Sequence, residues 1–99
     1  MNLEYRAEII SNQSVEEDII ELLEEKIPTI EYTIIPTVSG KGRKTQKLGN
    51  TIWPEQNFVL FTYLDKENAK ILNDCVKALI KRFPNEGISL FFTLSQSID

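Results

Sequence analysis

The chain has 99 residues, 41% of them apolar and 26% charged, which is the size and mixture of one compact globular domain. One cysteine and no histidine exclude an intramolecular disulfide, the usual transition-metal sites and catalytic pairs built on histidine. The formal net charge of −4 argues against indiscriminate nucleic-acid binding. Glu4, Arg6 and Glu8 interrupt the apolar run that a signal peptide needs, so we expect a cytoplasmic protein.

The first third of the chain predicts a strand followed by a helix. Residues 3–10 alternate apolar and charged side chains, which is the period of a half-buried strand. Ser14 precedes Glu17 by three positions, the spacing of a capping box, and apolar residues then recur at helical intervals. We therefore expect a helix over residues 14–26.

The remaining elements follow the same two periods. Residues 30–38 predict a strand in which Pro36, lacking an N–H group, indicates an edge position or the end of regular pairing. Asp65 is placed to cap a helix. The other predicted elements are a strand over 57–65, a helix over 66–83 and a strand over 88–94.

The order βαββαβ predicts an α+β, ferredoxin-like fold, a four-stranded antiparallel sheet with both helices on one face. Residues 57–65 and 88–94 carry apolar side chains at both alternating positions, so the other sheet face would also be apolar. An apolar face of this extent predicts a homo-oligomer formed through the sheet. The alternative is that the C-terminal residues SQSID fold across it, although five mostly polar residues are too few to cover four strands.

The segment Ser39 to Asn50 stands apart from the rest of the chain. It contains three of the four glycines and the basic residues Lys41, Arg43, Lys44 and Lys47, with no acid. The remainder carries seven basic against fifteen acidic residues, so an acidic body bears one basic loop. A connection of this length, about 39–56, is usually functional or disordered.

The glycines and the arginine of this segment suit an anion. Gly40 and Gly42 allow close backbone approach, and the planar guanidinium of Arg43 matches phosphate or carboxylate. The segment has neither the P-loop pattern nor GxGxxG. The competing interpretation is a solvated loop whose lysines keep an exposed sheet edge soluble.

The order of elements and this loop together resemble the PII signal-transduction family and its PII-like relatives. In that family a ferredoxin-like subunit carries a long loop, the T-loop, between its second and third strands, beginning GxGRxxG. Gly40, Lys41, Gly42, Arg43 and Lys44 match its beginning, and Ile52, Trp53 and Pro54 look like the step into the next strand. The resemblance covers nearly the whole chain in topology, as a single domain over 1–99 with a T-loop-like insertion at about 39–56.

The resemblance implies a trimeric regulatory protein, not an enzyme, with a small anionic effector bound between subunits and a T-loop that engages a target protein, whether soluble or membrane-bound. The effector could be an adenine nucleotide, and no cofactor or metal is required. The ligand-binding residues it implies are Gly40, Lys41, Gly42, Arg43, Lys44 and Gly87, the last in the turn before the final strand. The residues implied in partner binding are Lys47, Leu48 and Trp53.

Several positions depart from the family pattern. Ile88 stands where the second phosphate-contacting loop usually ends in a lysine, and Lys44 replaces the glutamine that helps bind 2-oxoglutarate with magnesium. No tyrosine for uridylylation lies in residues 39–50. These departures favour a divergent member that takes a smaller nucleotide or another anion.

Two rival functions share the same order of elements. An RNA-recognition-like module would stack bases on Phe58, Phe61 and Tyr63, although the basic residue and glycine that open its signature are absent. A small ferredoxin-like enzyme could bind an anion through Arg6, Arg43 or Arg82, but no acid, base and nucleophile set is readable. Cys75 lies among apolar helical positions and is interpreted as a core residue.

Overall fold

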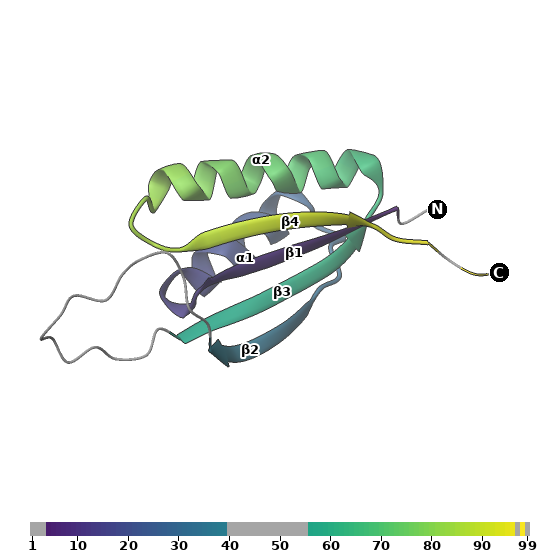
Figure 1. Cartoon of the computed structure of the whole chain (residues 1–99). Helices are drawn as coiled ribbons and strands as arrows, with labels where there is room; N and C mark the ends of the chain where they lie inside the picture. Colours follow the sequence, from purple (N-terminus) through teal and green to yellow (C-terminus); the bar gives the residue numbers. More distant parts are fainter. Residues whose placement is uncertain (1–3, 40–55, 97, 99) are drawn as a thin grey trace, which may run out of the picture.

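The computed structural model describes residues 4–39, 56–96 and 98. The chain runs through a strand, a helix, two strands, a helix and a last strand (Figure 1), and a 3-10 turn, η1, lies between the first strand and the first helix. The elements are β1 (Tyr5–Asn12), η1 (Gln13–Val15), α1 (Glu16–Lys26), β2 (Thr33–Ser39), β3 (Gln56–Leu64), α2 (Lys66–Arg82) and β4 (Ile88–Leu94).

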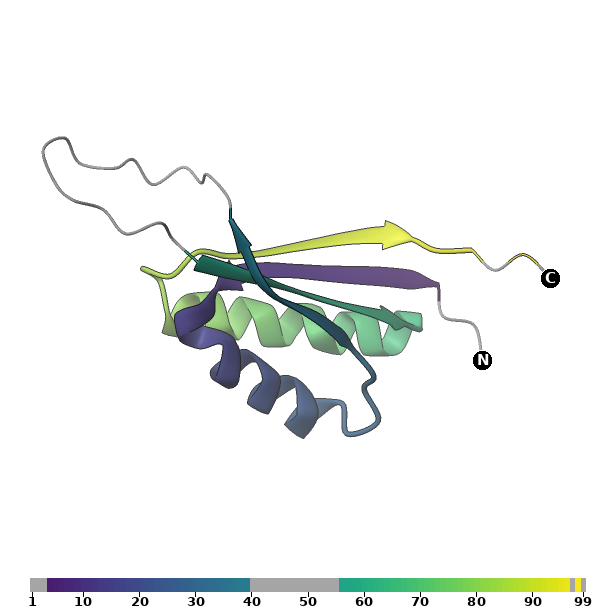
Figure 2. The ribbon, with the colours of Figure 1, turned by 90° about the horizontal axis from the view of Figure 1, so that it is seen from below.

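The four strands form one sheet in the order β2-β3-β1-β4, and every neighbouring pair is antiparallel. Both helices lie against the same face of the sheet (Figure 2). The predicted α+β, ferredoxin-like fold is therefore confirmed.

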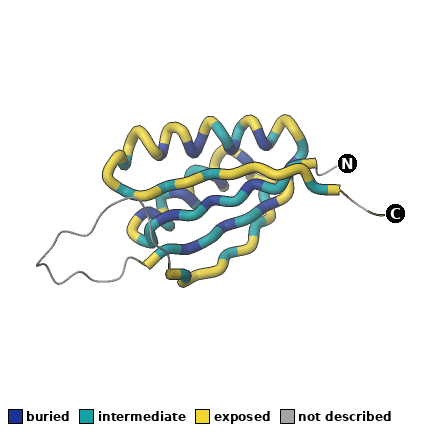
Figure 3. Tube along the Cα trace, viewed as in Figure 1, coloured by how far each residue is buried: buried dark blue, intermediate teal, exposed yellow. Residues whose placement is uncertain are grey.

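The core lies between the helices and the covered face of the sheet. Ile9 in the central strand β1 pairs with Leu60 on one side and Leu90 on the other, so these three side chains share the covered face. Figure 3 shows the buried positions along β1, β3 and the inner sides of the helices. The core residues include Ala7, Ile9, Ile19, Leu23, Phe58, Leu60, Leu72, Val76 and Leu79.

The opposite face of the sheet, which we call the open sheet face, carries no helix (Figure 2). Because Glu8 pairs with both Phe61 and Phe91, and Arg6 pairs with Tyr63, these side chains lie on one face. Its apolar members are Ile10, Ile35, Val59, Phe61, Tyr63 and Phe91. Phe91 is 57% exposed and Tyr63 46% exposed, so the predicted apolar face exists.

Strand β2 begins at Thr33, three residues later than the sequence predicted. The backbone N–H of Ile30 donates to the Ile27 carbonyl, and the Thr62 hydroxyl donates to the Glu31 carbonyl at 2.6 Å, so this stretch is bonded outside the strand ladder. The predicted edge position of Pro36 is confirmed. It lies in an edge strand, where the register with β3 shifts between Ile35 and Val38.

The predicted capping box at Ser14 is wrong. The Asn12 side chain accepts from the Ser14 N–H at 3.0 Å and caps η1, while α1 begins after Val15, whose side chain makes no capping bond. Ser14 itself lies within η1 and not before a helix, and its hydroxyl donates to Glu86 Oε2 at 2.9 Å, a partner distant in the chain.

Helix α2 matches its prediction closely. The Asp65 carboxylate accepts from the Asn68 N–H at 2.9 Å, which confirms it as the N-cap. The helix ends at Arg82, one residue before the predicted end.

Cys75 is buried in the core, as predicted, and burial raises the pKa of its thiol. Neither helix of the described chain is long and apolar enough to cross a bilayer.

Candidate functional site

Most of the predicted site residues fall in residues 40–55, outside the part of the chain that the structure describes. The assignments to them therefore remain predictions. They are Gly40, Lys41, Gly42, Arg43, Lys44, Lys47, Leu48 and Trp53. The residues on either side, Ser39 and Gln56, pair with each other across β2 and β3, so both ends of the basic segment leave the sheet at one place.

Gly87, the remaining predicted ligand residue, lies at the same end of the sheet. Its carbonyl accepts from the Asn12 N–H at 3.2 Å, and Asn12 pairs with Asn57 in β3. Asn57 also pairs with Val38 near the end of β2. We call this end of the sheet, where β1 and β2 finish and β3 and β4 begin, the loop end.

The backbone at Gly87 is open to approach. A Cβ atom added there would meet nothing within 4 Å, and the φ angle lies outside the left-handed region. Glycine is therefore not demanded here by backbone conformation or by crowding. A side chain at this position would fill part of the open space beside the turn, and the predicted ligand role of Gly87 stays a prediction.

Two polar side chains of η1 connect the segments at the loop end. Gln13 Nε2 donates to the Pro36 carbonyl and, at 3.1 Å, to Thr37 Oγ1, where β2 departs from regular pairing. Ser14 Oγ donates to Glu86 Oε2, in the turn that also contains Gly87. Sequence reasoning missed this cluster because its partners are far apart in the chain and no local motif joins them.

The charge at the α2–β4 turn does not by itself favour an anion, because Glu86 brings a carboxylate next to Gly87. An anion bound there would need positive charge from another part of the chain or from another subunit. Four basic residues stand between the two strand ends that leave the sheet at this place, namely Lys41, Arg43, Lys44 and Lys47.

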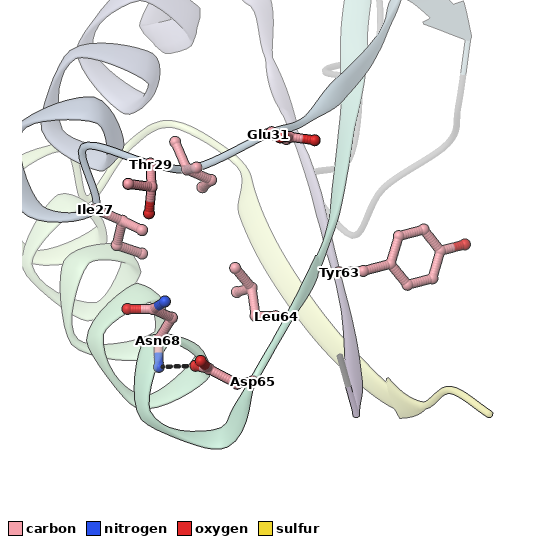
Figure 4. Close-up of a pocket in the computed structure, with 8 residues that line it drawn as sticks. Ile27, Thr29, Glu31, Tyr63, Leu64, Asp65 and Asn68 are labelled. Carbon is pink, nitrogen blue, oxygen red and sulfur yellow. Dashed lines mark hydrogen bonds between the residues drawn. The ribbon is translucent and has the colours of Figure 1, made fainter. Parts of the chain in front are cut away.

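A hollow of about 220 Å³ lies at the other end of the sheet, between the α1–β2 connection and the start of α2. Ile27 and Leu64 contribute to its apolar lining, whereas Tyr63 and Glu31 point away from the hollow (Figure 4). Asp65 is occupied in capping α2. The polar groups do not converge, and none of the predicted site residues lines this hollow.

The two arginines of the described chain that an anion-binding enzyme would use are already paired with carboxylates. Arg6 Nη1 lies 2.8 Å from Glu8 Oε2, and this hydrogen bond raises the pKa of the Arg6 guanidinium. Arg82 Nη2 lies 3.4 Å from Asp18 Oδ1. Within residues 4–39, 56–96 and 98, no group of three or more acidic or cysteine side chains is placed to hold a metal ion.

The fold and the loop end define a ferredoxin-like domain whose second and third strands flank a basic segment. No family model matches the chain, and no curated protein matches it. Solved structures of PII-like proteins are similar to it in fold. CPII from Thiomonas intermedia K12, bound to ADP and bicarbonate, superposes with a TM-score of 0.72 at 20% identity, over 95% of this chain and 87% of CPII.

Two further solved structures are also similar to this chain in fold. CPII bound to ADP, AMP and bicarbonate gives a TM-score of 0.72 at 19% identity, over 97% of this chain and 93% of CPII. A PII-like signaling protein from Thermus thermophilus gives 0.66 at 18% identity, over 93% of this chain and 86% of that one. The chain thus has the fold of PII-like proteins, and the resemblance seen in the sequence is confirmed at that level.

Proposed function

We propose that this chain is a divergent PII-like regulatory protein without enzymatic activity, which binds a small anionic effector between subunits and signals to a partner protein through residues 39–53. The observation that carries the proposal is that one predicted ligand turn lies beside the strand ends that flank the basic segment. The Gly87 turn and the residues flanking the basic segment, Ser39 and Gln56, lie at one end of the sheet.

The solved structures suggest the class of effector. CPII, which is similar in fold, is bound to ADP and bicarbonate in one structure and to ADP, AMP and bicarbonate in another. Both nucleotides carry fewer phosphates than ATP. This agrees with the absence of a phosphate-contacting lysine at Ile88. We therefore propose an adenine nucleotide with one or two phosphates, or a small anion such as bicarbonate, as the effector.

The open sheet face supports the oligomer in the proposal. A face that exposes Phe91 and Tyr63 together loses contact with water when a second copy covers it, and this burial is favourable. The resemblance to the PII family implies three subunits, and clefts between them would bring positive charge from one copy to the Gly87 turn of another.

Native mass spectrometry tests the proposal directly. The intact protein is measured alone and then with AMP, ADP, ATP, cyclic AMP and bicarbonate in turn. A trimer that retains one ligand per subunit is the expected result. A monomer that binds none of them, and instead binds a single-stranded RNA oligonucleotide, would replace the proposal with the RNA-recognition-like module.

Two charge variants separate a specific site from general attraction. Arg43→Ala should weaken binding of the retained ligand by roughly 10- to 100-fold, because a desolvated guanidinium bonded to phosphate contributes about 1.5–3 kcal/mol. Lys47→Ala removes the same charge from the same segment and should have a smaller effect. Equal losses, measured by calorimetry, would indicate diffuse electrostatics and would argue against Arg43 as a ligand residue.

A further inference from the structure

Three consecutive residues, Asn12 to Ser14, contact both the α2–β4 turn, which contains Gly87, and the end of β2, which precedes the basic segment. The Asn12 N–H donates to the Gly87 carbonyl, and Ser14 Oγ donates to Glu86 Oε2. Gln13 contacts the end of β2: its Nε2 donates to the Pro36 carbonyl and to Thr37 Oγ1. We call these residues the junction.

The Gln13 contacts lie where β2 is least constrained by the sheet. The register between β2 and β3 shifts between Ile35 and Val38, so Pro36 and Thr37 lie outside the regular ladder. The Gln13 amide supplies hydrogen bonds there, on an edge strand that has one neighbour in the sheet. Ser39, the last residue of β2, stands two positions after Thr37, so the amide of Gln13 holds the backbone two residues before β2 ends.

The Ser14 contact is sensitive to charge. Glu86 is half-buried, and its carboxylate is held by the hydroxyl of Ser14 at 2.9 Å. An anion that reaches the Gly87 turn repels this carboxylate and weakens its bond to Ser14. Ser14 and Gln13 are adjacent residues of one turn of 3-10 helix, so we expect a shift of the Ser14 backbone to move the Gln13 backbone as well.

We propose that Gln13 and Ser14 are positioning residues that couple the α2–β4 turn to the end of β2, so that an anion at Gly87 changes how the basic segment leaves the sheet. The proposal rests on the proposed function for its ligand. The coupling itself is a property of the described residues and can be tested without one.

The ligand-free test is a double-mutant cycle read by backbone NMR of the full chain. Glu86→Ala removes the carboxylate at the turn and should displace the amide signals of Thr37, Val38 and Ser39. In a Gln13→Ala background the same Glu86→Ala change should leave those signals in place. Gln13→Glu, which keeps the length of the side chain but lacks the Nε2 donor, should behave as Gln13→Ala does.

Amide hydrogen exchange gives a second readout. Loss of the Gln13 bonds should raise the exchange rate at Thr37 and Val38 about fivefold, the change expected for one exposed hydrogen bond, while amides of α2 keep their rates. Gln96→Ala is the matched control, since Gln96 is exposed and follows β4 at the far end of the sheet. It should change neither the signals of Thr37 nor their response to Glu86→Ala.

The proposed effector and the proposed coupling through Gln13 and Ser14 are tested by different results. If ADP, AMP and bicarbonate all fail to bind the wild-type protein, the proposed effector is wrong, and the ligand-free cycle still decides the coupling. If Glu86→Ala moves the signals of Thr37 and Val38 equally with and without Gln13, or moves them in neither background, the coupling is overturned. Where ADP binds, its effect on the Val38 and Ser39 amides should also be lost in Gln13→Ala, with the ADP affinity retained within about threefold.

Discussion

The Arg6 guanidinium carbon lies 4.7 Å from the centroid of the Phe61 ring, and the ring of Phe61 in turn meets Tyr63 edge-on at 6.4 Å. Glu8 holds the other side of the guanidinium through a bond of 2.8 Å. The centre of the open sheet face is therefore ordered around one paired charge and two aromatic rings. On this face the aromatic rings stay exposed, while the two opposite charges are paired with each other.

Phe91→Asp should dissociate the proposed oligomer. Assembly through the open sheet face would bury a carboxylate without a partner, which costs several kcal/mol and exceeds what most interfaces can absorb. Size-exclusion chromatography with light scattering measures the mass. Ile80→Asp is the matched control, because Ile80 is 43% exposed on α2, on the other side of the molecule, and should leave the mass unchanged. A monomeric wild type would overturn the proposed oligomer, and an oligomeric Phe91→Asp protein with the mass of the wild type would show that the subunits meet elsewhere.

Asp65→Ala should lower the free energy of unfolding by about 1 kcal/mol, because the Asn68 N–H loses its capping acceptor. In a domain of this size the change corresponds to a fall in Tm of roughly 4–8 °C. Asp74→Ala removes a carboxylate from an exposed position within the same helix and should not destabilise the protein. Thermal unfolding followed by circular dichroism compares the two, and equal losses would show that helix capping is not the cause.

The buried thiol of Cys75 predicts a loss of stability at high pH. Burial raises the pKa of the folded thiol above its unfolded value of about 8.5, so the unfolded chain releases its proton first as pH rises. The contribution of Cys75 is therefore complete below about pH 8.5 and declines above it. Urea unfolding from pH 7 to 10 should show the difference between wild type and Cys75→Ala shrinking. A difference that stays constant would mean that the thiol has its ordinary pKa when folded.

Thr62→Val should lower the free energy of unfolding by about 1 kcal/mol although it keeps the shape of the side chain. Thr62 is buried, and its hydroxyl is the donor at 2.6 Å from the Glu31 carbonyl, just before β2 begins. The same substitution at Thr93, which is exposed on β4, serves as the comparison in urea unfolding. If both variants lose equally, the bond to Glu31 contributes nothing measurable.

The sequence by itself determined the elements and their order. Alternation along residues 3–10, the acid at position 65 and the helical spacing between Ala69 and Leu79 are local patterns, and local physics is sufficient to interpret them to within about two residues of the observed bounds. The order βαββαβ then leaves few arrangements of the sheet. The basic composition of residues 39–50, and with it the expectation of an anionic effector, is likewise a property of sequence alone.

Tertiary structure decided what joins these pieces. The capping spacing at Ser14 was misleading because Ser14 lies within η1, whose N-cap is Asn12, and its hydroxyl reaches Glu86, 72 positions away, a contact that no local pattern records. The start of β2 was misplaced because the hydroxyl of Thr62, from β3, takes the Glu31 carbonyl. Bonds between distant residues depend on how strands and turns meet in space, so the link from Gly87 through the junction to the end of β2 became visible only in the folded chain.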